Sequence, residues 1–194
     1  CDWSSDVCSS DLLTLRRFRL TGKCTSNNCI PTCLSHSMMK IALAQQNYHI
    51  GNFQANTDKI IHAIQRAKKD KVDIVVFSEL CVCGYPPRDF LYFKDFSEKS
   101  LQAVQQIAAA SQDIAVIIGA PSANPKKEGK DLYNSAFFIA DGKIESVVHK
   151  TCLPTYDVFD ENRYFEPAGE WHVVSYKGKK IALTICEDIW NLGD

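Results

Sequence analysis

Three side chains of the kinds needed to attack a carbon–nitrogen bond each stand where an apolar run of the sequence ends. Glu79 follows Val-Val-Phe-Ser, Lys150 follows Val-Val-His, and Cys186 follows Ala-Leu-Thr-Ile. A thiolate can form a thioester with an amide carbon, a carboxylate can carry the proton, and an ammonium can stabilise negative charge on oxygen. The pattern predicts an enzyme with a cysteine nucleophile.

Each of these residues also has an ordinary interpretation. A cysteine after a buried run is most often a small buried hydrophobe, but Glu187 and Asp188 end this run and place Cys186 at a turn. Glu79 could be a solvated loop acid, but its place after a buried strand predicts that desolvation raises its pKa. Lys150 could lie on the surface. The aromatic-rich segment that follows it predicts partial burial, and a buried ammonium beside a thiol would favour the thiolate.

The composition is that of one globular domain, with 194 residues, 45% hydrophobic and 23% charged. The 22 basic and 23 acidic residues give a formal net charge of -1 and no excess of basic residues to attract phosphate backbones or anionic lipid. We therefore expect neither a nucleic-acid nor a membrane partner. From Met38 onward four cysteines remain, Cys81, Cys83, Cys152 and Cys186, with no secretory signal, which predicts reduced thiols in the cytoplasm.

Residues 1–37 differ from the rest of the chain because they show no sustained helical or strand period. The run from Val7 to Leu12 resembles the in-frame translation of a common sequencing adapter. We interpret residues 1–37 as an artefact followed by translated upstream sequence, expect them to be disordered, and place the true start at Met38 or Met39. A signal peptide is the alternative for residues 12–20, although arginines interrupt its apolar stretch.

A zinc site is the alternative for the cysteines of this segment. Cys24, Cys29 and Cys33 would need a fourth ligand such as His36, and their spacings match no tight zinc knuckle. We predict no metal site.

From residue 38 onward the hydrophobic periods predict strand, helix, strand, helix, strand, which is typical of a parallel or mixed sheet with crossover helices. The strands are expected at 40–46, 72–77 and 114–119, and Asn56 is expected to cap the first helix. Two hairpins should follow, at 135–149 around Asp141-Gly142 and at 171–185 around Gly178. The exposed sheet face must then pack on something such as a matching sheet. Because the chain ends soon after Cys186, we expect a domain truncated at its C-terminal end.

Three motifs in this order resemble the nitrilase, or carbon–nitrogen hydrolase, superfamily over residues 38–194. They are Glu79 after an apolar strand, Lys150 before x-x-Leu-Pro-x-Tyr, and Cys-Glu-Asp-Ile-Trp from Cys186. The segment from Cys83 to Leu91, Cys-Gly-Tyr-Pro-Pro-Arg-Asp-Phe-Leu, further resembles the amidotransferase domains of glutamine-dependent NAD(+) synthetases.

The resemblance implies an α/β fold, a four-layer αββα sandwich, in which Glu79 is the base, Cys186 the nucleophile and Lys150 an oxyanion donor. It also implies substrate-binding roles for Tyr85, Tyr156 and Glu187, and an auxiliary role for Glu161 in orienting Lys150 or stabilising charge. The substrate would be glutamine, and the released ammonia would serve ATP-dependent amidation of deamido-NAD to NAD in a separate C-terminal synthetase domain. No cofactor is expected in this segment, because ATP and magnesium would belong to that domain. The full-length protein would be a homo-oligomer.

Two other functions stay open at this point. A free-standing amidase, nitrilase or carbamoylase would use the same three residues, and a non-catalytic fragment would act only by association. The continuation of the reading frame past Asp194 distinguishes them, because a fused ATP-binding domain would indicate the synthetase.

Overall fold

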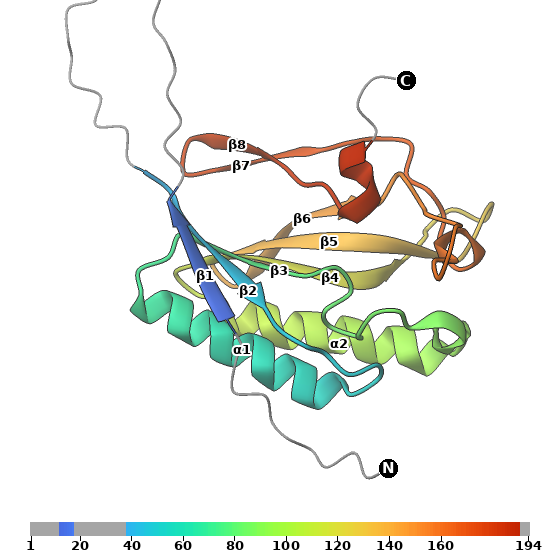
Figure 1. Ribbon diagram of the computed structural model, residues 1–194, viewed down its shortest axis with the longest axis horizontal. Coiled ribbons are helices and arrows are strands. Elements are labelled where there is room, and N and C mark those ends of the chain that lie inside the picture. Colours follow the sequence, from blue (N-terminus) through green and yellow to red (C-terminus); the bar gives the residue numbers. More distant parts are fainter. Residues whose placement is uncertain (1–11, 18–37, 191–194) are drawn as a thin grey trace, which may run out of the picture.

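The computed structural model describes the backbone of residues 12–17 and the whole of residues 38–190. Figure 1 shows two helices below a twisted sheet and a hairpin above it. The helices are α1 (Phe53–Lys69) and α2 (Lys94–Ala110). The strands are β1 (Leu12–Arg17), β2 (Lys40–Gln45), β3 (Ile74–Phe77), β4 (Ala115–Ala123), β5 (Leu132–Ala140), β6 (Lys143–His149), β7 (Val173–Tyr176) and β8 (Lys179–Ala182). Three short 3-10 helices are η1 (Arg88–Tyr92), η2 (Glu161–Arg163) and η3 (Cys186–Trp190).

The main sheet has the strand order β1-β2-β3-β4-β5-β6. Strands β2, β3 and β4 are parallel, which requires the crossover helices α1 and α2, whereas β4, β5 and β6 pair in antiparallel fashion. The predicted mixed sheet and the hairpin at Asp141-Gly142 are therefore confirmed. Both turn residues have positive φ, 48° and 80°, as a tight hairpin turn requires.

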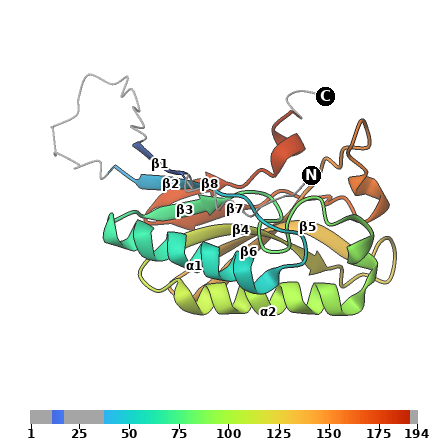
Figure 2. The same cartoon turned by 60° about the horizontal axis from the view of Figure 1, so that its bottom comes forward.

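Helices α1 and α2 cover one face of this sheet with the apolar sides that their sequence periods predict (Figure 2). Two details differ from the expectation. Asn52 caps α1 through the N–H of Ala55, whereas Asn56 lies inside the helix, where its buried side chain bonds to the backbone of His49 and Val82. Leu101 falls in the apolar period of α2, yet it is 45% exposed.

The opposite face packs against the β7–β8 hairpin, which is a separate two-stranded sheet. The apolar side chains between the sheets include Phe138 of β5, Val174 of β7 and Ile185 just before η3. A helix layer, a sheet and the start of a second sheet are thus present, in agreement with the expected sandwich. Within the described part of the chain, neither α1 nor α2 has the length and apolar composition that a bilayer crossing needs.

Residues 12–17 contradict part of the prediction for the N-terminal segment. They form β1, which pairs antiparallel with β2 from Leu12 opposite Gln45 to Arg17 opposite Lys40. Without β1, the edge of β2 would offer unpaired N–H and C=O groups, and a nearby segment with strand-forming residues can form hydrogen bonds with them. The expectation that residues 1–37 are disordered does not hold for these six residues. The remainder of that prediction lies outside the described residues.

Candidate active site

The sheet topology brings Glu79, Asn134 and Lys150 to one edge. Glu79 follows the end of β3, Asn134 lies near the start of β5, and Lys150 follows the end of β6. Because β5 runs opposite to β3 and β4 while β6 runs opposite to β5, these three positions meet. The backbone N–H of Lys150 donates to the backbone oxygen of Asn134 at 2.8 Å, which fixes the two side chains as neighbours.

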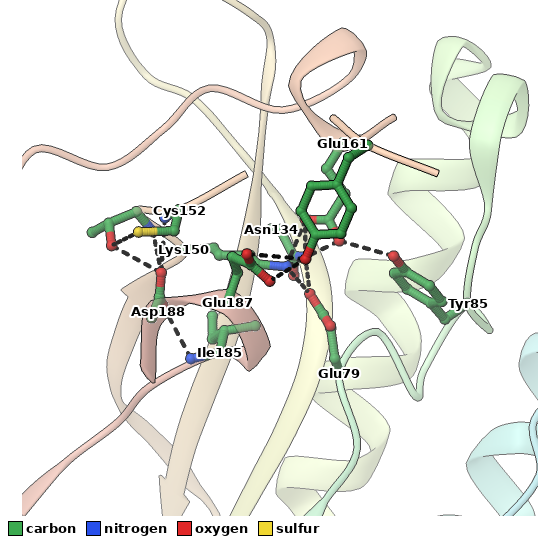
Figure 3. Close-up of polar contacts among 11 residues, drawn as sticks. Glu79, Tyr85, Asn134, Lys150, Cys152, Glu161, Ile185, Glu187 and Asp188 are labelled. Carbon is green, nitrogen blue, oxygen red and sulfur yellow. Dashed lines mark hydrogen bonds and ion pairs between the residues drawn. The ribbon is translucent and has the colours of Figure 1, made fainter. Parts of the chain in front are cut away.

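The Lys150 ammonium is fully buried between two carboxylates (Figure 3). Its Nζ donates to Oε1 of Glu79 at 2.7 Å and to Oε1 and Oε2 of Glu161 at 2.9 and 2.7 Å. Glu161 comes from η2 and is itself buried, and the Tyr85 hydroxyl donates to its Oε1 at 2.9 Å. Sequence reasoning expected Lys150 to be partly buried. Its complete burial is possible because both carboxylates neutralise it.

This cluster can store and release a proton. Burial raises the pKa of Glu79, as expected for a carboxyl group at the end of a buried strand, and the nearby charge of Glu161 raises it further. Burial alone would lower the pKa of Lys150, but the two carboxylates outweigh it and the pKa is raised. Lys150 therefore stays charged, and Glu79, whose pKa is raised above its ordinary value, is the better suited of the two to exchange a proton.

Cys186 begins η3, and its sulfur is presented from a sharp turn. It is exposed and has a φ of 45°, a left-handed conformation that is uncommon for a residue with a side chain. A cavity of about 100 Å³ lies between the sheets and is lined by Glu79, Asn134, Thr184 and Cys186, among others. The nucleophile candidate and the base candidate thus line the same cavity.

The Cys186 thiol does not gain net acidity from its surroundings. Burial and the charge of Glu79 raise its pKa, and the opposing effect of Lys150 is smaller. Lys150 does favour the thiolate, as expected, but burial of the thiol and the charges of the neighbouring carboxylates outweigh this effect, so the net pKa of Cys186 is raised. Attack by Cys186 consequently needs a base, and Glu79 is the candidate that shares its cavity.

Asp188 anchors the turn that carries Cys186. Its Oδ1 accepts hydrogen bonds from the N–H and hydroxyl of Thr151 and from the N–H of Cys152, at 2.8 to 2.9 Å, while its Oδ2 accepts from the N–H of Ile185 at 3.0 Å. Figure 3 shows Asp188 between these two chain segments. Asp188 is 4% exposed. One buried carboxylate therefore ties the segment after Lys150 to the turn before Cys186.

The other expected substrate-binding residues form an exposed pair. The Tyr156 hydroxyl donates to both carboxylate oxygens of Glu187, at 3.1 and 3.0 Å. Tyr85 lies on the other side of Glu161, where a larger cavity of about 490 Å³ is lined by Tyr85, Glu161 and residues of η1 and η2. The site residues expected from the sequence therefore gather in one region. Among residues 38–190 no group of three or more His, Cys, Asp or Glu side chains is arranged to hold a metal ion.

Sequence reasoning missed Asn134 and the structural part played by Asp188. Asn134 donates from Nδ2 to Glu79 at 2.6 Å and to Glu161 at 3.4 Å. The polar pair Asn134-Ser135 inside a buried and mostly apolar strand was a usable signal for it. For Asp188 the sequence shows only a short acidic pair after Cys186. The four groups that donate hydrogen bonds to its carboxylate become visible only in the fold.

The model of the family described as carbon-nitrogen hydrolase matches residues 40–192, and those residues contain the whole cluster. The chain belongs to the carbon-nitrogen hydrolase family. Its relatives include a glutamine-dependent NAD(+) synthetase from a Synechocystis species, which is 42% identical over 158 residues. That alignment covers 79% of this chain and 28% of the relative.

Two solved structures confirm the fold class. A glutamine-dependent NAD+ synthetase from Acinetobacter baumannii, in complex with ADP, is 39% identical with a TM-score of 0.74, covering 79% of this chain and 28% of that one. An amidase from a Nesterenkonia species is 25% identical with a TM-score of 0.64, covering 78% of this chain and 56% of the amidase. This carbon-nitrogen hydrolase thus spans little more than a quarter of the synthetases that it matches.

Proposed function

We propose that this carbon-nitrogen hydrolase is a glutaminase that releases ammonia from the glutamine side chain. The observation that carries the proposal is the contact of Glu79 with buried Lys150 at the rim of a cavity that Cys186 also lines. A base and a nucleophile that line one small cavity, with an ammonium in contact with the base, are the parts of acyl transfer through a thioester.

In the acylation step, Glu79 takes the proton of the Cys186 thiol and the sulfur attacks the carboxamide carbon. The Lys150 ammonium and the backbone N–H of Glu187 hold the negative charge on oxygen. Loss of one such donor typically costs about a hundredfold or more in rate. The intermediate collapses with cleavage of the C–N bond, and Glu79 returns its proton to the departing nitrogen, which leaves as ammonia.

In the deacylation step, Glu79 takes a proton from water and the water oxygen attacks the thioester carbon. The C–S bond breaks, glutamate leaves, and the proton returns to Cys186. The sum is glutamine plus water giving glutamate plus ammonia. The raised pKa of Glu79 suits a group that must gain and lose a proton in both steps.

The Tyr156–Glu187 pair supports an amino acid as substrate. A partly exposed carboxylate next to the nucleophile can bind the α-ammonium of glutamine, and Tyr156 fixes the orientation of that carboxylate. Tyr85 would contact the substrate from the side of Glu161. The names of the relatives agree with glutamine as the nitrogen donor.

The proposal extends to the full-length protein. The released ammonia would be used for ATP-dependent amidation of deamido-NAD to NAD in a separate synthetase domain, which would also hold ATP and magnesium. We propose a cytoplasmic homo-oligomer. The share of the synthetases that this chain covers, 28%, leaves room for such a domain.

The fold similarity to the Nesterenkonia amidase favours a second candidate, an amidase for simple amides. Comparison of glutamine with aliphatic amides that lack an α-amino group separates the two. A glutaminase should prefer glutamine strongly and lose that preference in Glu187→Gln, whereas an amidase should hydrolyse both substrates and be insensitive to this substitution.

Cys186→Ala in the full-length protein tests the proposal directly. We expect loss of glutamine-driven NAD synthesis and retention of synthesis from added ammonia, because the thiol serves only to release ammonia. Cys152→Ala is the matched control and should retain both activities, since Cys152 contacts Asp188 only through its backbone N–H. Retained glutaminase activity in Cys186→Ala would reject the assignment of the nucleophile.

A further inference from the structure

Asn134 is a neutral side chain enclosed by the charged groups of the site. It is 1% exposed, and its Nδ2 lies 2.6 Å from Oε1 of Glu79 and 3.4 Å from Oε2 of Glu161. A hydrogen bond from an N–H group to a carboxylate stabilises the ionised form and fixes its orientation. Asn134 therefore acts on the same Glu79 oxygen that accepts from Lys150.

The chemistry of the neighbours determines which way the Asn134 amide faces. Two carboxylates accept hydrogen bonds, so the NH2 end must point toward Glu79 and Glu161, and the carbonyl end must point away from them. That carbonyl oxygen, Oδ1, is buried and has no hydrogen-bond partner among the residues that the structure describes. Buried oxygens without partners cost free energy and are uncommon in folded proteins.

The cavity of about 100 Å³ that Asn134 lines offers a reason for this oxygen. Cys186 and Glu79 line the same cavity, and its volume suffices for a molecule the size of water or ammonia. An unpaired acceptor, a thiol and a carboxylate around such a space form a site for a small molecule that carries N–H or O–H groups.

We propose that Asn134 is part of the reaction site, where its N–H group positions Glu79 and its Oδ1 accepts a hydrogen bond from a water-sized N–H or O–H donor beside Cys186. This inference rests on the proposed glutaminase function. Two molecules of the reaction have the required chemistry. One is the ammonia that forms when the C–N bond breaks, and the other is the water whose oxygen attacks the thioester.

The two roles of Asn134 predict separate effects. Loss of its N–H donor raises the pKa of Glu79. Because Glu79 acts as a base only when ionised, the acidic limb of the pH profile of kcat/KM should move to higher pH. Loss of its acceptor slows the step in which the small molecule takes part. The charged and titratable groups that act on Glu79 are Lys150, Glu161, Cys186 and Tyr85. Changing Asn134 leaves these four side chains in place and, besides the bond to Glu79, removes only the longer hydrogen bond to Glu161, at 3.4 Å.

Two substitutions of similar shape separate the roles in the full-length protein. Asn134→Leu removes the donor and the acceptor, and we expect kcat/KM for glutamine to fall about tenfold to a hundredfold with the acidic limb displaced upward. Asn134→Asp keeps an oxygen acceptor but adds a negative charge, so its acidic limb should also move upward. At pH values above that limb, Asn134→Asp should be faster than Asn134→Leu.

Rapid quench with mass spectrometry of the intact enzyme identifies the bound molecule. Accumulation of the thioester in Asn134→Leu means that deacylation is slowed and that Oδ1 holds the water. Slow formation of the thioester without accumulation, relieved in Asn134→Asp at pH values above the acidic limb, means that Oδ1 holds the departing ammonia. Either result supports the proposal.

Asn56→Leu is the matched control, because Asn56 is also buried but bonds only to the backbone of His49 and Val82. It should lower the melting temperature and leave the pH profile in place. Wild-type kinetics and pH profile in both Asn134 variants, or an equal displacement of the limb in Asn56→Leu, would overturn the inference. An inactive wild-type enzyme would instead reject the glutaminase function itself.

Discussion

The Nζ of Lys150 lies 2.7 Å from Oε1 of Glu79, although the two residues are 71 positions apart in the sequence. The contact joins the end of β6 to the end of β3 through the intervening strands β4 and β5. The site consequently depends on the register of the central sheet. A displacement of one strand by one residue would turn these side chains to opposite faces.

Lys150→Met should cost both stability and activity. Without the ammonium, Glu79 and Glu161 repel each other in a poorly solvated site, and removing one partner of a buried pair typically costs about 3–5 kcal/mol. The glutaminase rate should fall about a hundredfold or more, because one oxyanion donor is lost. Urea unfolding and steady-state kinetics measure the two effects. The double variant with Glu161→Gln should recover stability but not activity, and an unchanged unfolding midpoint in Lys150→Met would contradict the buried pairing.

Glu79→Gln should abolish glutaminase activity and change how stability depends on pH. The pKa of Glu79 is raised above its ordinary value of 4.5, so between that value and the folded pKa the folded protein holds a proton that the unfolded chain has released. Its contribution to stability is therefore present below pH 4.5 and is lost as the pH rises through the folded pKa. Urea midpoints across this range should fall less steeply in Glu79→Gln than in the wild type. Parallel curves would show that Glu79 does not titrate there.

The sequence predicted the parts of the fold that local patterns determine. Apolar runs located β2, β3 and β4, and Asp141-Gly142 located the turn between β5 and β6. Glu79 comes just after the apolar run of β3 and Lys150 just after the apolar run of β6, so both were expected at strand ends. Because the order of parallel and antiparallel strands follows from connection length, their convergence at one sheet edge was within reach of the sequence.

Properties that depend on several distant groups were not predictable in this way. The pKa of Cys186 depends on the burial of its thiol and on the carboxylates that the fold gathers around it, and neither can be read from the local sequence. The pairing of β1 depends on the free edge of β2 rather than on a period within residues 12–17. Asn56 resembled a helix cap locally, but the fold uses it to join α1 to Val82.

Asp188→Asn should displace the turn that carries Cys186. The Oδ2 atom accepts from the N–H of Ile185, and the Oδ1 atom accepts three bonds, so an amide NH2 in either position meets a donor. We expect a loss of about 1.5–3 kcal/mol in stability and a lower glutaminase kcat. Thermal melts and kinetics test this. Asp160→Asn is the control, because Asp160 is exposed and its ion pair with Arg163, at 3.9 Å, contributes little. A wild-type melting temperature in Asp188→Asn would show that the turn does not need this carboxylate.

Tyr156→Phe should weaken glutamine binding without affecting the fold. The substitution removes the two hydrogen bonds that orient Glu187, at 3.0 and 3.1 Å, while Tyr156 is 56% exposed and contributes little to the core. We expect KM for glutamine to rise about fivefold to tenfold, with kcat changed by less than about twofold. Tyr164→Phe is the matched control, since its hydroxyl bonds to Asp89 instead and should leave KM unchanged. If KM stayed constant in Tyr156→Phe, or rose equally in the control, Glu187 would not be the group that binds the ammonium of glutamine.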